Sequence, residues 1–174
     1  ERAGVSFRGK SVAVCGTGPT SLSILHAVAQ AGPSEVILIG RDKEKARKVM
    51  RTYADELGAM IGRTVDMPAF KEGHLSFSEV YKQVGFKFGS YATSRQAIAG
   101  ADIVIDATPL GMRAGDPAPF DTELLRAGQT VFDVVYGHGE TALARAAQSC
   151  GGYVSSTSID TPAYEGAYRT AYYQ

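Results

Sequence analysis

The 174-residue sequence has little cysteine, no excess of charge and no long apolar run. Cys15 and Cys150 are its two cysteines, and neither belongs to a CxxC or Cys/His cluster, so we interpret both as structural. Eighteen basic and eighteen acidic side chains cancel, which argues against nucleic acid or an anionic membrane as a partner. No run is long enough to span a bilayer and no signal peptide is present, so we expect a cytoplasmic protein.

Patterns for metal binding and nucleophilic catalysis are also missing. His26, His74 and His138 lack the spacing of metal ligands, so no metal site is expected. Ser21 and Ser23 stand near His26, but helical periodicity explains this spacing better than a catalytic triad does. No repeat or low-complexity tract is present, and a chain of this length is expected to form a single domain.

Short β-branched runs alternate with amphipathic segments along most of the chain. Strands are expected within 12–15, 35–40, 103–105, 129–137 and 152–156. Helices are expected within 21–31, 43–62 and 140–151, and a brief helix is expected between 94–96 and the strand at 103–105. This alternation predicts an α/β fold with a doubly wound, mostly parallel Rossmann-like sheet and helices on both faces. Residues from about 63 to 93 mix short apolar patches with turn residues, and suggest a strand, an inserted hairpin or short helix, and a loop.

A tyrosine recurs every four residues near the C-terminus, at Tyr164, Tyr168 and Tyr172. This spacing indicates one face of a helix, and an aromatic stripe of this kind usually serves packing. The face would pack on the sheet or on another subunit, which leaves a homo-oligomer open.

The stretch GTGPTS joins the first strand to the first helix, and it comprises Gly16, Thr17, Gly18, Pro19, Thr20 and Ser21. In a phosphate-binding turn, one glycine permits the tight bend and the next lets a pyrophosphate approach the backbone at the helix N-terminus. Ser21 stands where Gly or Ala is usual, and Pro19 has no N–H group. We therefore expect the hydroxyls of Thr20 and Ser21 to complete the cradle, although a turn without a ligand is the alternative.

The second strand ends in Gly40, Arg41 and Asp42, with Lys45 soon after. At this point a Rossmann site contacts the adenosine ribose, where an acid favours a free 2′-hydroxyl and Arg favours a 2′-phosphate. Arg41 and Lys45 favour NADP because both can bind phosphate. Asp42 favours NAD instead, so NAD stays open as the second cofactor. The alternative to a phosphate site is that these charged residues belong to a solvent-exposed helix start and bind no ligand.

Together with GRDKEKA, ADIVIDATPLGM and FDVVYGHGETALARAA, the GTGPTS turn resembles the NADP-binding domain of the shikimate/quinate dehydrogenase family over about residues 1–155. The resemblance assigns Gly40 to Lys45 to the 2′-phosphate cluster, with Arg41 kept and Lys45 replacing a second Arg. It places one set of residues beside the nicotinamide, namely Thr108, Pro109, Leu110, Met112 and Val134, and directs Tyr136 toward the substrate. Asp106 replaces the family's Asn.

The resemblance implies hydride transfer between NADP(H) and 3-dehydroshikimate/shikimate or a related ring hydroxy acid. The family's catalytic Lys and Asp belong to an amino-terminal substrate domain that this sequence does not resemble. We therefore assign residues 1–174 to a dinucleotide-binding domain with a divergent tail at 156–174, name no catalytic residue, and expect no turnover by the chain alone. The alternatives are a non-catalytic nucleotide-sensing or partner-binding Rossmann module and a folate- or pterin-linked NADP-dependent dehydrogenase.

Overall fold

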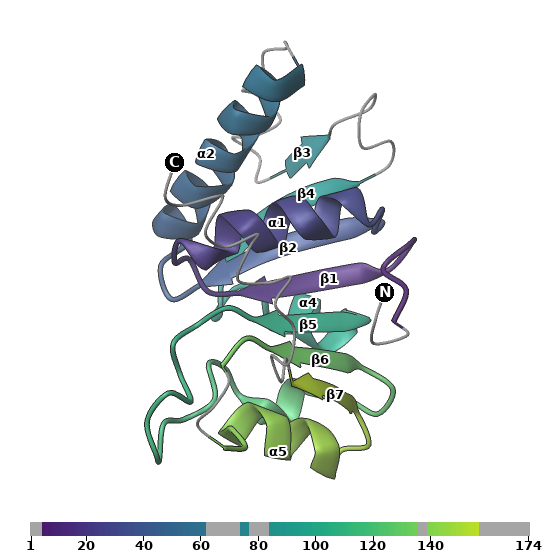
Figure 1. Ribbon diagram of the computed structural model, residues 1–174, viewed down its shortest axis with the longest axis vertical. Helices are drawn as coiled ribbons and strands as arrows, with labels where there is room; N and C mark the ends of the chain where they lie inside the picture. Colours follow the sequence, from purple (N-terminus) through teal and green to yellow (C-terminus); the bar gives the residue numbers. More distant parts are fainter. Residues whose placement is uncertain (1–4, 62–73, 77–83, 136–138, 157–174) are drawn as a thin grey trace, which may run out of the picture.

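The computed structural model describes residues 5–61, 74–76, 84–135 and 139–156, and these form one sheet covered by helices (Figure 1). The elements in chain order are β1 (Ser11–Cys15), α1 (Thr20–Gln30), β2 (Glu35–Gly40), α2 (Lys43–Ile61), β3 (His74–Ser76), β4 (Gly85–Ser90), α4 (Arg95–Gly100), β5 (Ile103–Asp106), the 3-10 helix η1 (Thr122–Leu124), β6 (Thr130–Asp133), α5 (Ala142–Ser149) and β7 (Tyr153–Ser156).

The seven strands follow the order β3-β4-β2-β1-β5-β6-β7. The described pairs are parallel except β3 with β4, which is antiparallel. The chain builds outward from β1 through β2 to β4, and then returns to the other side of β1 to add β5, β6 and β7. This reversal confirms the predicted doubly wound Rossmann-like sheet, and in such sheets ligands bind beyond the carboxyl ends of the strands at the reversal point.

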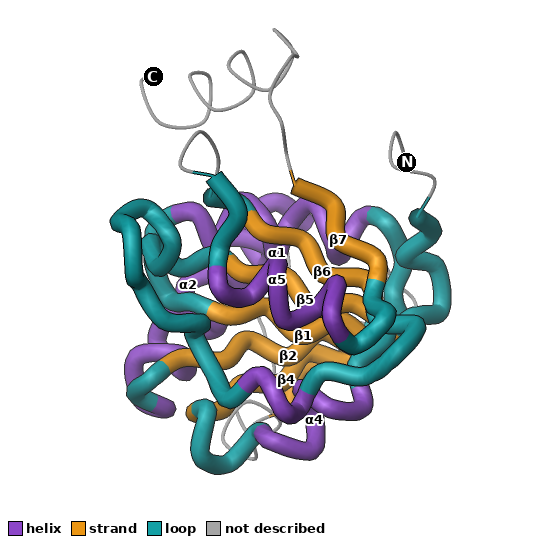
Figure 2. Tube along the Cα trace, turned by 90° about the horizontal axis from the view of Figure 1, so that it is seen from below, coloured by secondary structure: helices purple, strands orange, loops and turns teal. Residues whose placement is uncertain are grey.

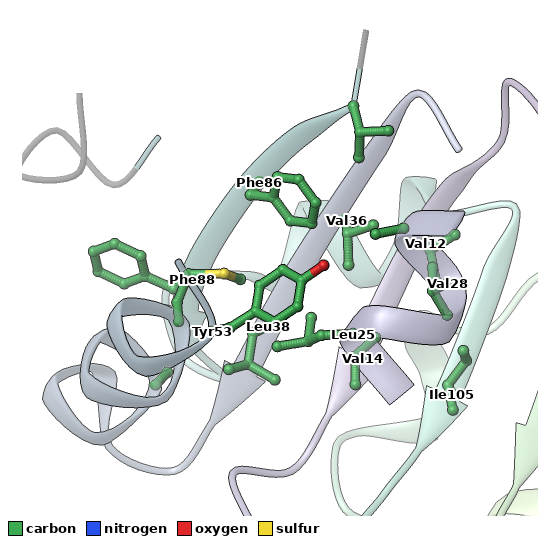
Figure 3. Packing of buried hydrophobic residues seen from close by; sticks show 14 of the residues in the cluster. Val12, Val14, Leu25, Val28, Val36, Leu38, Tyr53, Phe86, Phe88 and Ile105 are labelled. Atoms are coloured by element: carbon green, nitrogen blue, oxygen red, sulfur yellow. The ribbon is translucent and has the colours of Figure 1, made fainter. Parts of the chain in front are cut away.

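Helices lie on both faces of the sheet (Figure 2), and an apolar layer on each face holds them in place. On the face covered by α1 and α2, Val14 and Leu38 of the sheet pack with Leu25 of α1 (Figure 3). Tyr53 of α2 lies in the same layer, with its ring centroid 5.6 Å from that of Phe86. Because both faces of the central strands are buried, these strands read as continuous apolar runs in the sequence.

The secondary structure between α2 and α4 is the part of the fold that the sequence did not predict clearly. The structure shows β3 pairing antiparallel with β4, while residues 62–73 and 77–83 lie outside the described residues, so the choice between a hairpin and a short helix stays a prediction. The tyrosine stripe and His138 lie outside the described residues. Cys15 and Cys150 are both free thiols. None of the described helices combines the length and the apolar character needed to cross a membrane.

Candidate functional site

A cleft of about 340 Å³ lies where the loops after β1, β2, β4 and β5 meet, within the size range of small-molecule sites. Its lining consists of Gly16, Thr17, Gly18, Gly40, Arg41, Lys45, Tyr91, Ala107, Thr108, Pro109, Leu110 and Pro119. The cleft therefore stands at the reversal point of the sheet, and it brings together the three predicted segments from distant parts of the chain.

The two glycines of the first turn have different physical roles. Gly16 has φ +115°, and a Cβ there would lie 2.8 Å from the carbonyl oxygen of Ala107, so only glycine allows this bend against the end of β5. A Cβ on Gly18 would meet no atom within 4 Å. Gly18 thus borders open space in the cleft, as expected where a ligand approaches the backbone.

Helix α1 begins at Thr20 with unsatisfied backbone donors. Within the described part of the chain, the N–H groups of Thr17, Gly18 and Thr20 form no hydrogen bond, and no side chain caps the helix. The first N–H groups of a helix carry partial positive charge and are free to bind an anion. The turn therefore offers donors for a phosphate even though Pro19 supplies none.

Ser21 does not fit the expectation that its hydroxyl faces the ligand. Its side chain is fully buried, and the hydroxyl donates to the carbonyl oxygen of Gly16 at 2.8 Å. This bond closes the turn from inside and explains why a small polar residue follows Thr20. Pro19, Thr20 and Ser21 do not line the cleft, and contact between the Thr20 hydroxyl and a ligand stays a prediction.

Arg41 and Lys45 are exposed and line the cleft, whereas Asp42 does not. The Asp42 carboxylate accepts hydrogen bonds from the backbone N–H groups of Glu44 at 2.8 Å and Lys45 at 3.4 Å. It therefore caps the start of α2, a role that the sequence analysis did not assign to it. Among the described residues neither Arg41 nor Lys45 forms an ion pair, so both cations are available to an anionic ligand.

The residues predicted beside the nicotinamide are only partly brought together. Thr108, Pro109 and Leu110 line the cleft, but Met112 and Val134 do not. The Met112 side chain is 52% exposed, and Val134 packs against the apolar layer beneath α1 and α2. Tyr136 lies outside the described residues, so its predicted contact with a substrate is untested.

The cleft also has lining residues that no sequence motif predicted, namely Tyr91, Ala107 and Pro119. The backbone N–H of Tyr91 donates to the carbonyl oxygen of Gly40 at 3.0 Å, which fixes the residue beside the end of β2. Burial, with smaller contributions from Cys15 and Asp106, raises the pKa of the Tyr91 phenol above its ordinary range, while nearby Arg41 acts in the opposite direction. The pairing of β4 with β2 is the signal that would have identified Tyr91.

Buried acids lie at the ends of β5 and β6, below the cleft. Asp106 is 1% exposed and pairs in register with Asp133, which is 2% exposed. The pKa of Asp106 is raised to about 7, chiefly by burial; hydrogen bonds from Thr108 oppose the rise, and Asp133 makes a smaller raising contribution. Burial and Asp106 raise the pKa of the Cys15 thiol. No three His, Cys, Asp or Glu side chains of the described segments are grouped to hold a metal ion.

Comparison with known proteins finds relatives along most of the chain, although no family model matches it. Over 150 residues the chain is 37% identical to the shikimate dehydrogenase (NADP(+)) of Rubrobacter xylanophilus, an alignment covering 86% of this chain and 44% of that protein. Quinate dehydrogenase from Corynebacterium glutamicum, solved in complex with NAD, has 26% identity and a TM-score of 0.61, over 84% of this chain and 44% of that one.

Shikimate 5-dehydrogenase from Listeria monocytogenes, solved with shikimate and NAD, shares the fold with a TM-score of 0.66 at 21% identity, over 89% of this chain and 48% of that one. The chain spans less than half the length of each of these three proteins. Its sequence and its doubly wound sheet match them along most of its own length. Over most of its own length the chain is therefore similar to shikimate and quinate dehydrogenases, and the part that it shares with them is a Rossmann-like domain.

Proposed function

We propose that this chain is the NADP-binding domain of a shikimate-dehydrogenase-like oxidoreductase. The observation that carries the proposal is one cleft that combines the free N–H groups of Thr17 and Gly18, in the turn before α1, with the cations Arg41 and Lys45. A ligand with one anionic group near each of its ends would fit this arrangement. The Rubrobacter relative is named for NADP(+), which agrees with the charge of the cleft.

Each wall of the cleft is assigned a part of the nucleotide. The turn at Gly18 would hold the pyrophosphate, and Arg41 with Lys45 would hold the 2′-phosphate. Thr108 to Leu110, at the end of β5, would form the wall nearer the nicotinamide. When bound, the cofactor supplies the hydride chemistry, and the residues of this chain bind and orient it.

Gly18→Ala tests the pyrophosphate assignment. The added methyl group would enter open space, so the variant should fold with an unchanged melting temperature but bind NADP+ at least about tenfold more weakly, because the methyl group occupies the path of the phosphate. Calorimetry with NADP+ measures the binding. Gly16→Ala is the contrasting variant, since its Cβ would contact the Ala107 backbone and should lower the melting temperature. Unchanged NADP+ affinity in Gly18→Ala contradicts the assignment.

The reaction of the whole protein is proposed as hydride transfer between NADP(H) and 3-dehydroshikimate/shikimate or a related ring hydroxy acid. Among the described residues, the cleft lining contains no carboxylate and no histidine, and its side chains that could exchange a proton, Lys45 and Tyr91, lie beside the end of β2, at the part assigned to the 2′-phosphate. An acid–base group for the proton that accompanies hydride transfer is therefore expected from elsewhere in the enzyme. A cytoplasmic location is part of this proposal and agrees with the two free cysteines.

These 174 residues alone should bind NADP+ without catalysing the reaction. The measurement is a steady-state assay of shikimate-dependent NADP+ reduction, run beside calorimetry on the same sample so that binding is established. Binding without turnover is the expected result. Turnover by the isolated chain would show that it contains the acid–base group, and the assignment of that group to another domain would be wrong.

A further inference from the structure

We propose that Asp106 is a positioning residue of the nucleotide cleft that works as a neutral carboxylic acid, and that the cleft binds NADP+ more weakly once this proton is lost. The inference rests on the proposed function and concerns the regulation of the same site. It goes beyond the family resemblance, since Asp106 stands where the resemblance leads us to expect the neutral amide of Asn.

Asp106 lies in a row of side chains at the carboxyl ends of three strands. Cys15 of β1 pairs in register with Asp106 of β5, which pairs with Asp133 of β6. Paired residues of parallel strands project from the same face of the sheet. All three are at least 98% buried, so this row is largely withdrawn from water and an ionised carboxyl there is costly.

The two acids of this row have different surroundings. Asp133 accepts hydrogen bonds from the Val135 N–H at 2.9 Å and from the Thr141 hydroxyl at 2.5 Å. Asp106 accepts at Oδ1 from the Thr108 N–H at 2.8 Å. Among the described residues, the donors to Asp133 come from two separate segments, whereas those to Asp106 come from Thr108 alone, so a negative charge on Asp106 is accepted by fewer donors.

Asp106 is connected directly to the walls of the cleft. The next residue, Ala107, packs against Gly16 so closely that a Cβ on that glycine would lie 2.8 Å from the Ala107 oxygen. The carboxyl group holds the N–H of Thr108, whose own hydroxyl accepts from the Leu110 N–H at 3.2 Å. A change at Asp106 therefore acts on the turn proposed for the pyrophosphate and on the opposite wall.

The groups facing Asp106 do not compensate a negative charge. Cys15 on β1 and Tyr91 after β4 are neutral groups whose pKa values are raised, and Asp133 on β6 is a second acid. Arg41, near Tyr91, is exposed at the cleft mouth, where the nucleotide itself would engage it. Bringing a polyphosphate to this region favours the protonated form of Asp106. Nucleotide binding near neutral pH should thus take up a proton.

Calorimetry with NADP+ at about pH 6 and about pH 9 tests the inference on three proteins: wild type, Asp106→Asn and Asp55→Asn. The affinity of the wild type should fall about tenfold more over this range than that of Asp106→Asn, equivalent to one pKa unit of coupling. Asp55 is an exposed residue of α2 paired with Arg51, so its variant removes a distant charge and should behave as wild type. Titration of the 2′-phosphate affects all three proteins alike.

The outcomes separate this inference from the proposed function. Equal pH dependence in wild type and Asp106→Asn overturns the role of Asp106 while NADP binding stands. Absence of NADP+ binding in the wild type at every pH overturns both. If Asp106→Asn does not fold, the Asp106 carboxyl carbon of the wild type is titrated by NMR. Its midpoint should move to higher pH when NADP+ is present, and an unchanged midpoint overturns the inference.

Discussion

Asp106→Asn should raise the free energy of unfolding at about pH 8.5 by about 2 to 4 kcal/mol. The wild-type side chain is 1% exposed and its pKa is raised to about 7, chiefly by burial. Above that pH the folded protein contains a buried carboxylate that is not fully compensated. Asparagine removes this charge, and its side-chain oxygen can still accept from the Thr108 N–H.

The pH dependence follows from the direction of the shift. An aspartate in the unfolded chain ionises near pH 4, whereas Asp106 in the folded protein holds its proton up to about pH 7. Between these values the folded state binds more protons than the unfolded state, so stability falls as pH rises and then levels off above about pH 7. The advantage of the Asn variant should therefore be absent near pH 4 and complete above pH 7.

Urea unfolding at several pH values measures this difference. Asp133→Asn is the matched control, because the same substitution one strand away removes a carboxylate that accepts from both Val135 and Thr141. That variant should lose stability at alkaline pH. If Asp106→Asn is no more stable than wild type at about pH 8.5, Asp106 is compensated in the folded protein and the cost assigned to its burial is wrong.

The central unit of the fold could be predicted because its signals are local. Val12 to Cys15, the glycine turn and the run ending at Gly40 each show their structure within a few residues, and the following helices have clear periodicity. The cleft contains nine of the predicted binding residues, because parallel strands bring their carboxyl ends to the same edge of the sheet.

The remaining features depend on contacts between distant segments. Tyr91 joins the cleft because β4 pairs with β2, which the mixed pattern of residues from about 63 to 93 did not indicate. Ser21 and Asp42 were named as ligand contacts, but local hydrogen bonds use Ser21 to close its turn and Asp42 to cap α2. The raised pKa of Asp106 comes chiefly from its burial in the folded sheet, with a smaller contribution from its register partner Asp133, and residue types alone reveal neither.

Arg41→Ala should weaken NADP+ binding about 30- to 100-fold and NAD+ binding only a fewfold. A charge-assisted hydrogen bond to a phosphate contributes about 2 to 3 kcal/mol, and NAD+ has no 2′-phosphate to lose. Arg41 is exposed at the cleft and has no ion-pair partner among the described residues, so its guanidinium is free for this contact. Calorimetry with both nucleotides measures the ratio of the two affinities.

Asp42→Ala is the control for Arg41, since the two residues are adjacent and opposite in charge. Loss of the Asp42 carboxylate removes the cap of α2 and should lower the free energy of unfolding by about 1 kcal/mol. The ratio of NADP+ to NAD+ affinity should stay within a few fold, because Asp42 does not line the cleft. Equal weakening of both nucleotides by Arg41→Ala would instead place the guanidinium against the adenine ring, which they share. Lys45, at the same end of the cleft, would then be the residue that selects NADP.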